Sequence, residues 1–179
     1  MPLIQVFIAT HNRPSLVLNA ISSALNQHFD SFDVIVSDNS TNDQTEILLT
    51  QIEDKRFYYK RRRPSLPVID HLNAILKEVT ADYFMIFHDD DLMNSNMLQE
   101  LYKNIISNKD IIAVGGNAKI VSPDIFPNKL MLKRENGNLI ISSRDQMAHQ
   151  YLIRRGIVPF PSYLYKCKVA KKLKFNLNN

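Results

Sequence analysis

The sequence contains little cysteine, little glycine and no long apolar run, and each shortage excludes a class of protein or site. Because Cys167 is the single cysteine, the sequence excludes an internal disulfide and a cysteine-based zinc cluster, and we interpret this residue as a small structural side chain. Only four glycines are present, and none lies in the loops after the first two expected strands. The dinucleotide-binding fingerprint and the phosphate-binding P-loop are therefore both missing.

Membrane-spanning and secretory signals are also missing. No stretch approaches the ~20 apolar residues that are needed to cross a bilayer, and residues 1–5 lack the basic segment and apolar core of a signal peptide. We therefore expect a cytoplasmic protein. Its 179 residues, 45% hydrophobic and 22% charged, suit a single globular domain over residues 1–179.

The formal charge of +4 is unevenly spread along the chain. Residues 144–179 carry eight Lys or Arg and one Asp. Solvated helix faces account for most such runs, but a basic stretch can also contact an anionic surface, such as the inner face of a membrane or a phosphate-bearing acceptor.

Apolar patterning predicts strands and helices that alternate along the first two thirds of the chain. Nearly continuous apolar runs are typical of strands covered on both faces, and apolar residues at helical spacing indicate helices that pack on a sheet. The expected strands are 3–9, 32–37, 57–59, 83–87, 111–121 with a break at Gly115 and Gly116, and 160–165. The expected helices are 14–25, 68–79, 97–106 and 145–154. A capping box of Asp43 and Glu46 also predicts a helix that runs from there to about Ile52. The helix 145–154 is expected to have its cap at Ser142 or Ser143 and its end at Gly156. Residues 122–137 are expected to form a long loop. This order predicts an α/β fold of three layers, α/β/α, around a mainly parallel central sheet.

The most informative motif is the strand 84–87, which runs through His88 into Asp89, Asp90 and Asp91. Three adjacent carboxylates at the end of a buried strand repel one another unless a divalent cation or hydrogen-bond donors compensate. Ligands of open α/β sheets bind at the carboxyl ends of the strands. The motif therefore predicts a metal site that holds a phosphorylated ligand, although the aspartates could instead solvate a loop and cap the helix that begins near Asn94 or Ser95.

An ordered set of motifs resembles family 2 glycosyltransferases of GT-A fold. The set consists of residues 8–14, residues 34–42, Asn73 and residues 87–92, which read IATHNRP, VIVSDNSTN, N and FHDDDL. The resemblance covers roughly the first 120 residues in order and spacing, with weaker likeness afterwards. It implies a nucleotide-sugar-binding core over 1–120, and in 121–179 the start of an acceptor-side region that is apparently truncated at the carboxyl terminus.

The resemblance also implies which residues contact the nucleotide. Thr10, Asn12 and Arg13 occupy the segment that lines the nucleotide, and His11 stands where an aromatic residue is common. Asp38 matches an aspartate that contacts the base or the ribose. The remaining residues that we assign to nucleotide binding are Arg63 and Asn73. Each has a simpler structural alternative: Asn12 could cap a helix, Asp38 could form a turn, and the run Arg61–Arg63 could be a solvated loop whose three side chains cannot all point inward.

In the acidic motif, the resemblance implies that Asp91 is the main ligand of Mg²⁺ or Mn²⁺. Asp89 and Asp90 would contact the ribose or a metal-bound water, and Asp89 is a second candidate ligand. The family usually has leucine where this chain has His88. We interpret His88 as a strand-end residue with a local hydrogen bond, although an imidazole can also bind a metal.

The activity that the resemblance implies is an inverting transfer. A sugar moves from a nucleotide-diphosphate sugar, with a UDP-sugar favoured, to a glycan or lipid-linked acceptor, and the metal stabilises the departing nucleoside diphosphate. No catalytic base is assigned, because none of the downstream carboxylates Asp124, Glu135 and Asp145 lies in a matching motif.

Two other classes of function stay open on the sequence. A metal-dependent phosphohydrolase also needs clustered aspartates, but it usually has an aspartate nucleophile directly after the first strand, where this chain has Thr10 and His11. A nucleic-acid-binding module could use Arg61–Arg63 and the basic carboxyl-terminal stretch. However, the acidic triplet would repel a phosphate backbone unless it held a metal ion. We therefore expect no nucleic-acid partner.

Overall fold

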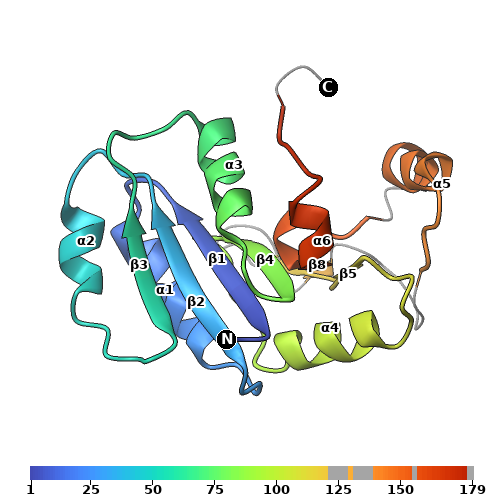
Figure 1. The fold of residues 1–179 in the computed structure, drawn as a ribbon, viewed down its shortest axis with the longest axis horizontal. Helices are drawn as coiled ribbons and strands as arrows, with labels where there is room; N and C mark the ends of the chain where they lie inside the picture. Colours follow the sequence, from blue (N-terminus) through green and yellow to red (C-terminus); the bar gives the residue numbers. More distant parts are fainter. Residues whose placement is uncertain (121–128, 131–138, 155–156, 177–179) are drawn as a thin grey trace.

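The structure is a computed structural model that describes residues 1–120, 129–130, 139–154 and 157–176. Its centre is a six-stranded sheet with helices on both faces (Figure 1). In the order in which they lie, the strands are β3 (Phe57–Arg61), β2 (Phe32–Asp38), β1 (Ile4–Thr10), β4 (Tyr83–His88), β8 (Tyr163–Lys166) and β5 (Ala113–Gly115). The first four are mutually parallel, whereas β8 runs antiparallel to both β4 and β5. The mainly parallel α/β sheet is therefore confirmed.

The helices cover both faces of the sheet, which confirms the three layers. They are α1 (Pro14–Leu25), α2 (Gln44–Leu49), α3 (Val68–Glu78), α4 (Met97–Ile106), α5 (Arg144–His149) and α6 (Cys167–Ala170), with a π-helical segment Gln150–Arg154 and a 3-10 turn Phe160–Ser162. Because neighbouring side chains of a strand point to opposite faces, Val6 and Phe7 of β1 enter different cores.

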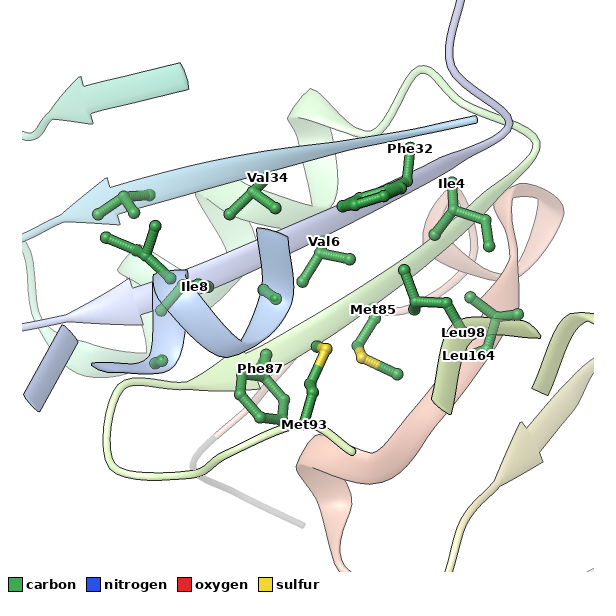
Figure 2. Close-up of a cluster of buried hydrophobic side chains, with 14 of the residues drawn as sticks. Ile4, Val6, Ile8, Phe32, Val34, Met85, Phe87, Met93, Leu98 and Leu164 are labelled. Carbon is green, nitrogen blue, oxygen red and sulfur yellow. The ribbon is translucent and has the colours of Figure 1, made fainter. Parts of the chain in front are cut away.

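The larger core lies between the sheet and α1, α2 and α4. Buried side chains of β1, β2 and β4 pack there against the apolar faces of α1 and α4, and Leu49 of α2 joins them. Figure 2 shows part of this cluster, with Ile4, Val6, Val34 and Met85 among its labelled members. The smaller core joins the other sheet face to α3 and α6. Its fully or nearly buried residues are Phe7, Ile75, Leu76, Val79, Phe84, Ile86 and Ala170. These two cores fix the strands whose carboxyl ends carry the polar motifs.

The structure corrects several expected elements. Asp43 precedes α2 without a side-chain cap, because its carboxylate and that of Glu46 bind Arg63 instead, and α2 ends at Leu49 rather than near Ile52. The acidic triplet caps no helix, since α4 begins at Met97 after Asn96.

The last third departs most from expectation. The predicted strand 111–121 is divided into β5 and β6 (Lys119–Ile120), and β6 pairs with β7 (Lys129–Leu130) in a separate two-stranded sheet. β5 ends at Gly115, where a Cβ would meet the side chains of Val158 and Tyr163 at 2.4 and 2.7 Å, so a larger residue would require those side chains to move. The rest of the predicted loop 122–137, together with Gly156, lies outside the described residues. Ser143 caps α5 as expected, because its hydroxyl accepts from the Gln146 backbone N–H.

The predicted strand 160–165 divides into the 3-10 turn and β8. Since β8 lies between β4 and β5, a segment from beyond residue 120 completes the sheet of the amino-terminal region. No helix in the described ranges is long and apolar enough to cross a membrane.

Candidate functional site

Three polar segments meet at one edge of the sheet. In the register of the parallel strands, Thr10 lies beside Asp38 and Ala9 lies beside His88. The loop after β1, the loop after β2 and the acidic triplet after β4 therefore leave the sheet together, at the edge to which the arrowheads of β1, β2 and β3 point in Figure 1. This is the edge at which ligands of α/β sheets bind.

Asp89 is held inside this edge by two donors. The Thr10 hydroxyl donates to Oδ2 at 2.7 Å, and Arg13 Nη1 donates to Oδ1 at 3.2 Å. Thr10 and Asp89 are 3% and 5% exposed. The same guanidinium nitrogen contacts Asp90 Oδ2 at 3.2 Å, and the Arg13 side chain remains half exposed. Asp89 thus anchors the triplet to the loop after β1, and Arg13 spans two of its carboxylates.

Within the part of the chain that the structure describes, the groups that can hold a metal ion together are His88, Asp90 and Asp91, which we call the cation cluster. One ligand atom from each lies within 4.8 Å of the others. His88 Nδ1 lies 3.8 Å from Asp91 Oδ2, and both side chains are about half exposed. The predicted ligand Asp91 lies within this set, whereas the second predicted ligand, Asp89, lies outside it and bonds to Thr10 and Arg13. His88 belongs to the set, whereas the sequence favours a strand-end residue with a local hydrogen bond.

The pKa of Asp91 reflects the burial and crowding of this side chain. Partial burial raises the pKa of this carboxyl group, Asp90 and Asp89 raise it further, and His88 acts in the opposite direction. The raised pKa means that a negative charge at Asp91 is disfavoured by its surroundings. A divalent cation would relieve this repulsion, and the residues present therefore fit such an ion.

The loops after β1 and β2 are joined through Asn12. This residue has a positive φ of 56°, which asparagine adopts more readily than most residues. Its amide oxygen accepts from the Thr41 backbone N–H at 3.0 Å and from the Asn42 side chain at 3.1 Å. Its own backbone N–H donates to Ser40 Oγ at 2.7 Å. Asn12 is therefore a link between loops, and α1 has no side-chain cap.

His11 strengthens the same link. Its Nδ1 lies 2.7 Å from the Asn39 carbonyl oxygen, and because a carbonyl can only accept, we assign the ring proton to Nδ1. Nε2 then accepts from the Asn12 side-chain amide at 3.2 Å. The exposed imidazole is thereby fixed in one orientation at the rim of the edge.

Asp38 lies behind these loops with a fully buried side chain. Its Oδ1 accepts from the backbone N–H and the hydroxyl of Ser40, while Oδ2 accepts from the Tyr59 hydroxyl at 2.7 Å and from Arg61 Nη1 at 2.9 Å. Burial, and then the bond to Asp38, raise the pKa of Tyr59, so its hydroxyl stays protonated as a donor. Direct contact between Asp38 and a nucleotide would require the carboxylate to give up one of these four donors.

The side chains of the arginine run Arg61–Arg63 lie in three different environments. Arg61 binds Asp38, and Arg62 is buried against Glu78, with contacts of 2.6 and 2.8 Å between its two terminal nitrogens and the two carboxylate oxygens. Hydrogen bonds from Arg62 and Lys60 outweigh partial burial and lower the pKa of Glu78. The run therefore does not form the basic surface that a nucleic-acid-binding module would need.

A buried polar network beneath β2 was missed by sequence reasoning. The Ser37 hydroxyl lies 2.7 Å from His71 Nε2 and accepts from Arg62 Nε at 3.0 Å. Burial, and then the Arg62 charge, lower the pKa of His71 to about 4, so the ring is neutral near pH 7 and Nε2 accepts the Ser37 proton. No sequence signal identifies this network. Ser37 belongs to the motif of residues 34–42, but nothing in that motif predicts a histidine partner 34 positions away.

Two residues predicted to contact a nucleotide have other partners. Arg63 is exposed and binds Asp43 and Glu46 at 3.1 and 2.7 Å, on the side of α2. Asn73 lies on α3, and both polar atoms of its side chain bond to the backbone of Phe175. Arg63 and Asn73 are thus not gathered with Thr10, Arg13 and the acidic triplet by any contact that the structure describes.

Two solved structures of similar fold contain bound nucleotide sugars. The chain superimposes on *S. aureus* TarS 1–349 in complex with UDP-GlcNAc with a TM-score of 0.73, at 18% identity, over 98% of this chain and 49% of that one. It also superimposes on the mannosyltransferase PcManGT from *Pyrobaculum calidifontis*, in complex with GDP-Man and Mn²⁺, with a TM-score of 0.69, at 16% identity, over 99% and 48% of the two chains. These likenesses confirm the GT-A type of fold.

Relatives in sequence point to the same family. An uncharacterized glycosyltransferase of *Methanocaldococcus jannaschii* is 26% identical over 98% of this chain, which spans 59% of that relative's length. The GalNAc(5)-diNAcBac-PP-undecaprenol beta-1,3-glucosyltransferase of *Campylobacter jejuni* is 28% identical over 67% of this chain and 39% of its own length. The model of the family described as Glycosyl transferase family 2 matches residues 5–171. On this match over most of its length, the chain belongs to glycosyl transferase family 2.

Proposed function

We propose that the chain binds the nucleoside diphosphate of a sugar donor, together with a divalent cation, at the edge formed by β1, β2 and β4. The observation that carries this proposal is the convergence of ligand atoms from His88, Asp90 and Asp91 within 4.8 Å, beside the guanidinium of Arg13. The chain has no glycine-rich loop there whose backbone amides could neutralise a diphosphate. A cation held at the carboxylates would supply that positive charge.

The donor set of the cation cluster suits Mn²⁺ or Mg²⁺, and we favour Mn²⁺. Two carboxylates provide the hard oxygen ligands that both ions accept, whereas the imidazole of His88 is a softer ligand that Mg²⁺ rarely takes. The *Pyrobaculum calidifontis* mannosyltransferase was solved with Mn²⁺, which supports the same choice. When bound, the ion would neutralise diphosphate oxygens and stabilise the nucleoside diphosphate as a leaving group.

Around the cation cluster, some side chains would contact the ligand, and others hold those side chains in place. Arg13 is half exposed and has further N–H donors, so it is our choice for direct contact with the diphosphate. His11 and Asn12 lie at the rim, where they would border the nucleoside. Thr10 and Asp38 are buried, and we assign them supporting roles: Thr10 orients Asp89, and Asp38 holds Ser40 and Arg61.

We propose that the reaction served by this site is inverting transfer to a glycan or lipid-linked acceptor. The acceptor oxygen bonds to the anomeric carbon as the bond to the nucleoside diphosphate breaks, and a base takes the acceptor proton. Family membership supports the transfer, and the undecaprenol-linked substrate in the *C. jejuni* relative's name supports the acceptor class. We assign no base, because Asp124 and Glu135 lie outside the described residues and Asp145 is exposed in the first turn of α5.

A calorimetric titration of nucleoside diphosphates tests the donor site. UDP should bind in Mn²⁺ and lose at least about tenfold in affinity when EDTA replaces the metal, as expected when a coordinating charge is removed. GDP is titrated in parallel, because the ligands of the structural neighbours carry uracil in one case and guanine in the other. The nucleotide that binds more tightly identifies the preferred base. UDP affinity that is the same in Mn²⁺ and in EDTA would contradict the role of the cation cluster, and absence of binding by either nucleotide would contradict the proposed site.

A further inference from the structure

The side chain of Asn73 on α3 clamps the segment 172–176. The residue that it binds is Phe175, 102 positions further along the chain. Asn73 Nδ2 donates to the Phe175 carbonyl oxygen at 3.0 Å, and the Phe175 backbone N–H donates to Asn73 Oδ1 at 2.8 Å. The amide thus satisfies both backbone polar groups of one residue, as a neighbouring strand would do. The Phe175 side chain packs against the smaller core. This clamp fixes Phe175 in both backbone and side chain.

From Phe175, ring contacts lead to the cation cluster. The Phe175 and Phe160 rings meet edge to face, with centroids 5.9 Å apart and an interplanar angle of 83°. The Phe160 ring in turn lies 6.0 Å from the imidazole of His88, tilted by 43°. Both separations lie within the range in which aromatic rings attract one another. Phe160 belongs to the 3-10 turn before β8, so that turn is held between the clamp and the end of β4.

His88 has few other restraints on its ring. It is the last residue of β4, its side chain is 47% exposed, and its described polar contact is the 3.8 Å approach to Asp91. A histidine that binds a metal needs its ring held so that one nitrogen faces the ion, and groups behind the ligand usually provide this. In this chain the ring that lies against His88 is Phe160, which the Asn73 clamp holds through Phe175.

We propose that Asn73 is a positioning residue: by clamping Phe175 it holds Phe160 against His88 and so orients that imidazole in the cation cluster. The functional part of this inference rests on the proposed cation site, whereas the orientation of His88 is a property of the protein without metal. Asn73 acts on the site from behind, through two rings, since both polar atoms of its side chain are bonded to Phe175.

The orientation of His88 can be measured by NMR on protein with labelled histidine, without any metal. Asn73→Ala and Phe160→Leu should each shift or broaden the His88 ring signals, which a His88→Gln variant assigns. The signals of His28, which bonds to Asn96 elsewhere in the fold, should stay in place. Phe160→Tyr keeps the ring and should preserve the His88 signals. As a matched control, Asn108→Ala removes an exposed asparagine–backbone bond and should leave His88 unchanged.

The effect on metal binding is tested by a double-mutant cycle on Mn²⁺ affinity in the presence of UDP. Asn73→Ala and Phe160→Leu should each weaken Mn²⁺ binding about tenfold, in the range known for groups behind a metal ligand. The double variant should lose no more affinity than the more affected single variant, because both changes break the same chain of contacts.

The inference is overturned if the His88 signals stay unmoved in Asn73→Ala, or if the two losses of affinity multiply in the double variant. Failure of the wild-type protein to bind Mn²⁺ would instead reject the proposed cation site, and the metal-free NMR comparison would still decide whether Asn73 orients His88.

Discussion

Replacement of Asp91 by asparagine is expected to abolish cation-dependent nucleotide binding. The change keeps the shape of the side chain and removes the charge that a divalent ion requires. Since loss of a group behind a metal ligand costs about 10- to 100-fold in affinity, loss of a ligand itself should cost at least about 100-fold. Calorimetry with UDP and Mn²⁺ measures the loss.

The same variant should be at least as stable as the wild type in the absence of metal. The Asp91 carboxyl has a raised pKa because burial and neighbouring aspartates disfavour its charge, so a neutral side chain relieves repulsion. Asp110→Asn changes an exposed carboxylate in the turn before β5 and should alter neither property. Retention of metal-dependent UDP binding in Asp91→Asn would remove Asp91 from the site.

Replacement of Asp38 by alanine is expected to cause the largest loss of stability. It leaves the buried Arg61 without its close carboxylate partner, with Asp43 remaining at 3.6 Å, and removes the acceptor for Tyr59 and Ser40. Loss of one member of a buried ion pair typically costs about 3 to 5 kcal/mol. For a chain of this size, the corresponding fall in melting temperature is on the order of 10 °C. Urea unfolding and thermal denaturation measure both quantities.

Asp43→Ala is the matched control for Asp38→Ala. Asp43 also pairs with arginine, at 3.1 Å from Arg63 and 3.6 Å from Arg61, but its side chain is 65% exposed. Exposed pairs contribute at most about 1 kcal/mol, because water screens the charges and both side chains lose freedom. If the two variants lose similar stability, the buried carboxylate of Asp38 does not organise this edge in the way that we describe.

The strands and helices of the first 106 residues could be predicted because local pattern and tertiary packing agree there. Apolar runs such as 3–9 are covered on both faces, and each helix after them carries an apolar stripe that meets the sheet. The position of β8 could not be predicted in the same way. β8 pairs with β4 and β5, which lie far away along the chain. The residues Tyr163–Lys166 contain no local pattern that predicts these two partners.

For the candidate site, the sequence located the edge but not the partners of each side chain. Motif position brought Thr10, Arg13 and the acidic triplet together correctly. What each side chain contacts depended on burial: Asp89 is enclosed by two donors and Asp38 by four, and His88 lies in the cation cluster. Arg61, Arg62 and Arg63 are adjacent in sequence yet bind three different acidic groupings, because successive residues at a strand end point in different directions.

The most direct test of the proposed site is the mutual effect of Mn²⁺ and UDP on each other's binding. Free Mn²⁺ can be followed by electron paramagnetic resonance, with and without UDP, and UDP binding can be followed by calorimetry, with and without Mn²⁺, after correction for the Mn²⁺–UDP complex that forms without protein. If the ion lies between the cation cluster and the diphosphate, each ligand should tighten the other by the same factor, at least about tenfold, since linkage between two binding sites is reciprocal. Two ligands that bind independently, or a protein that binds neither, would contradict the account.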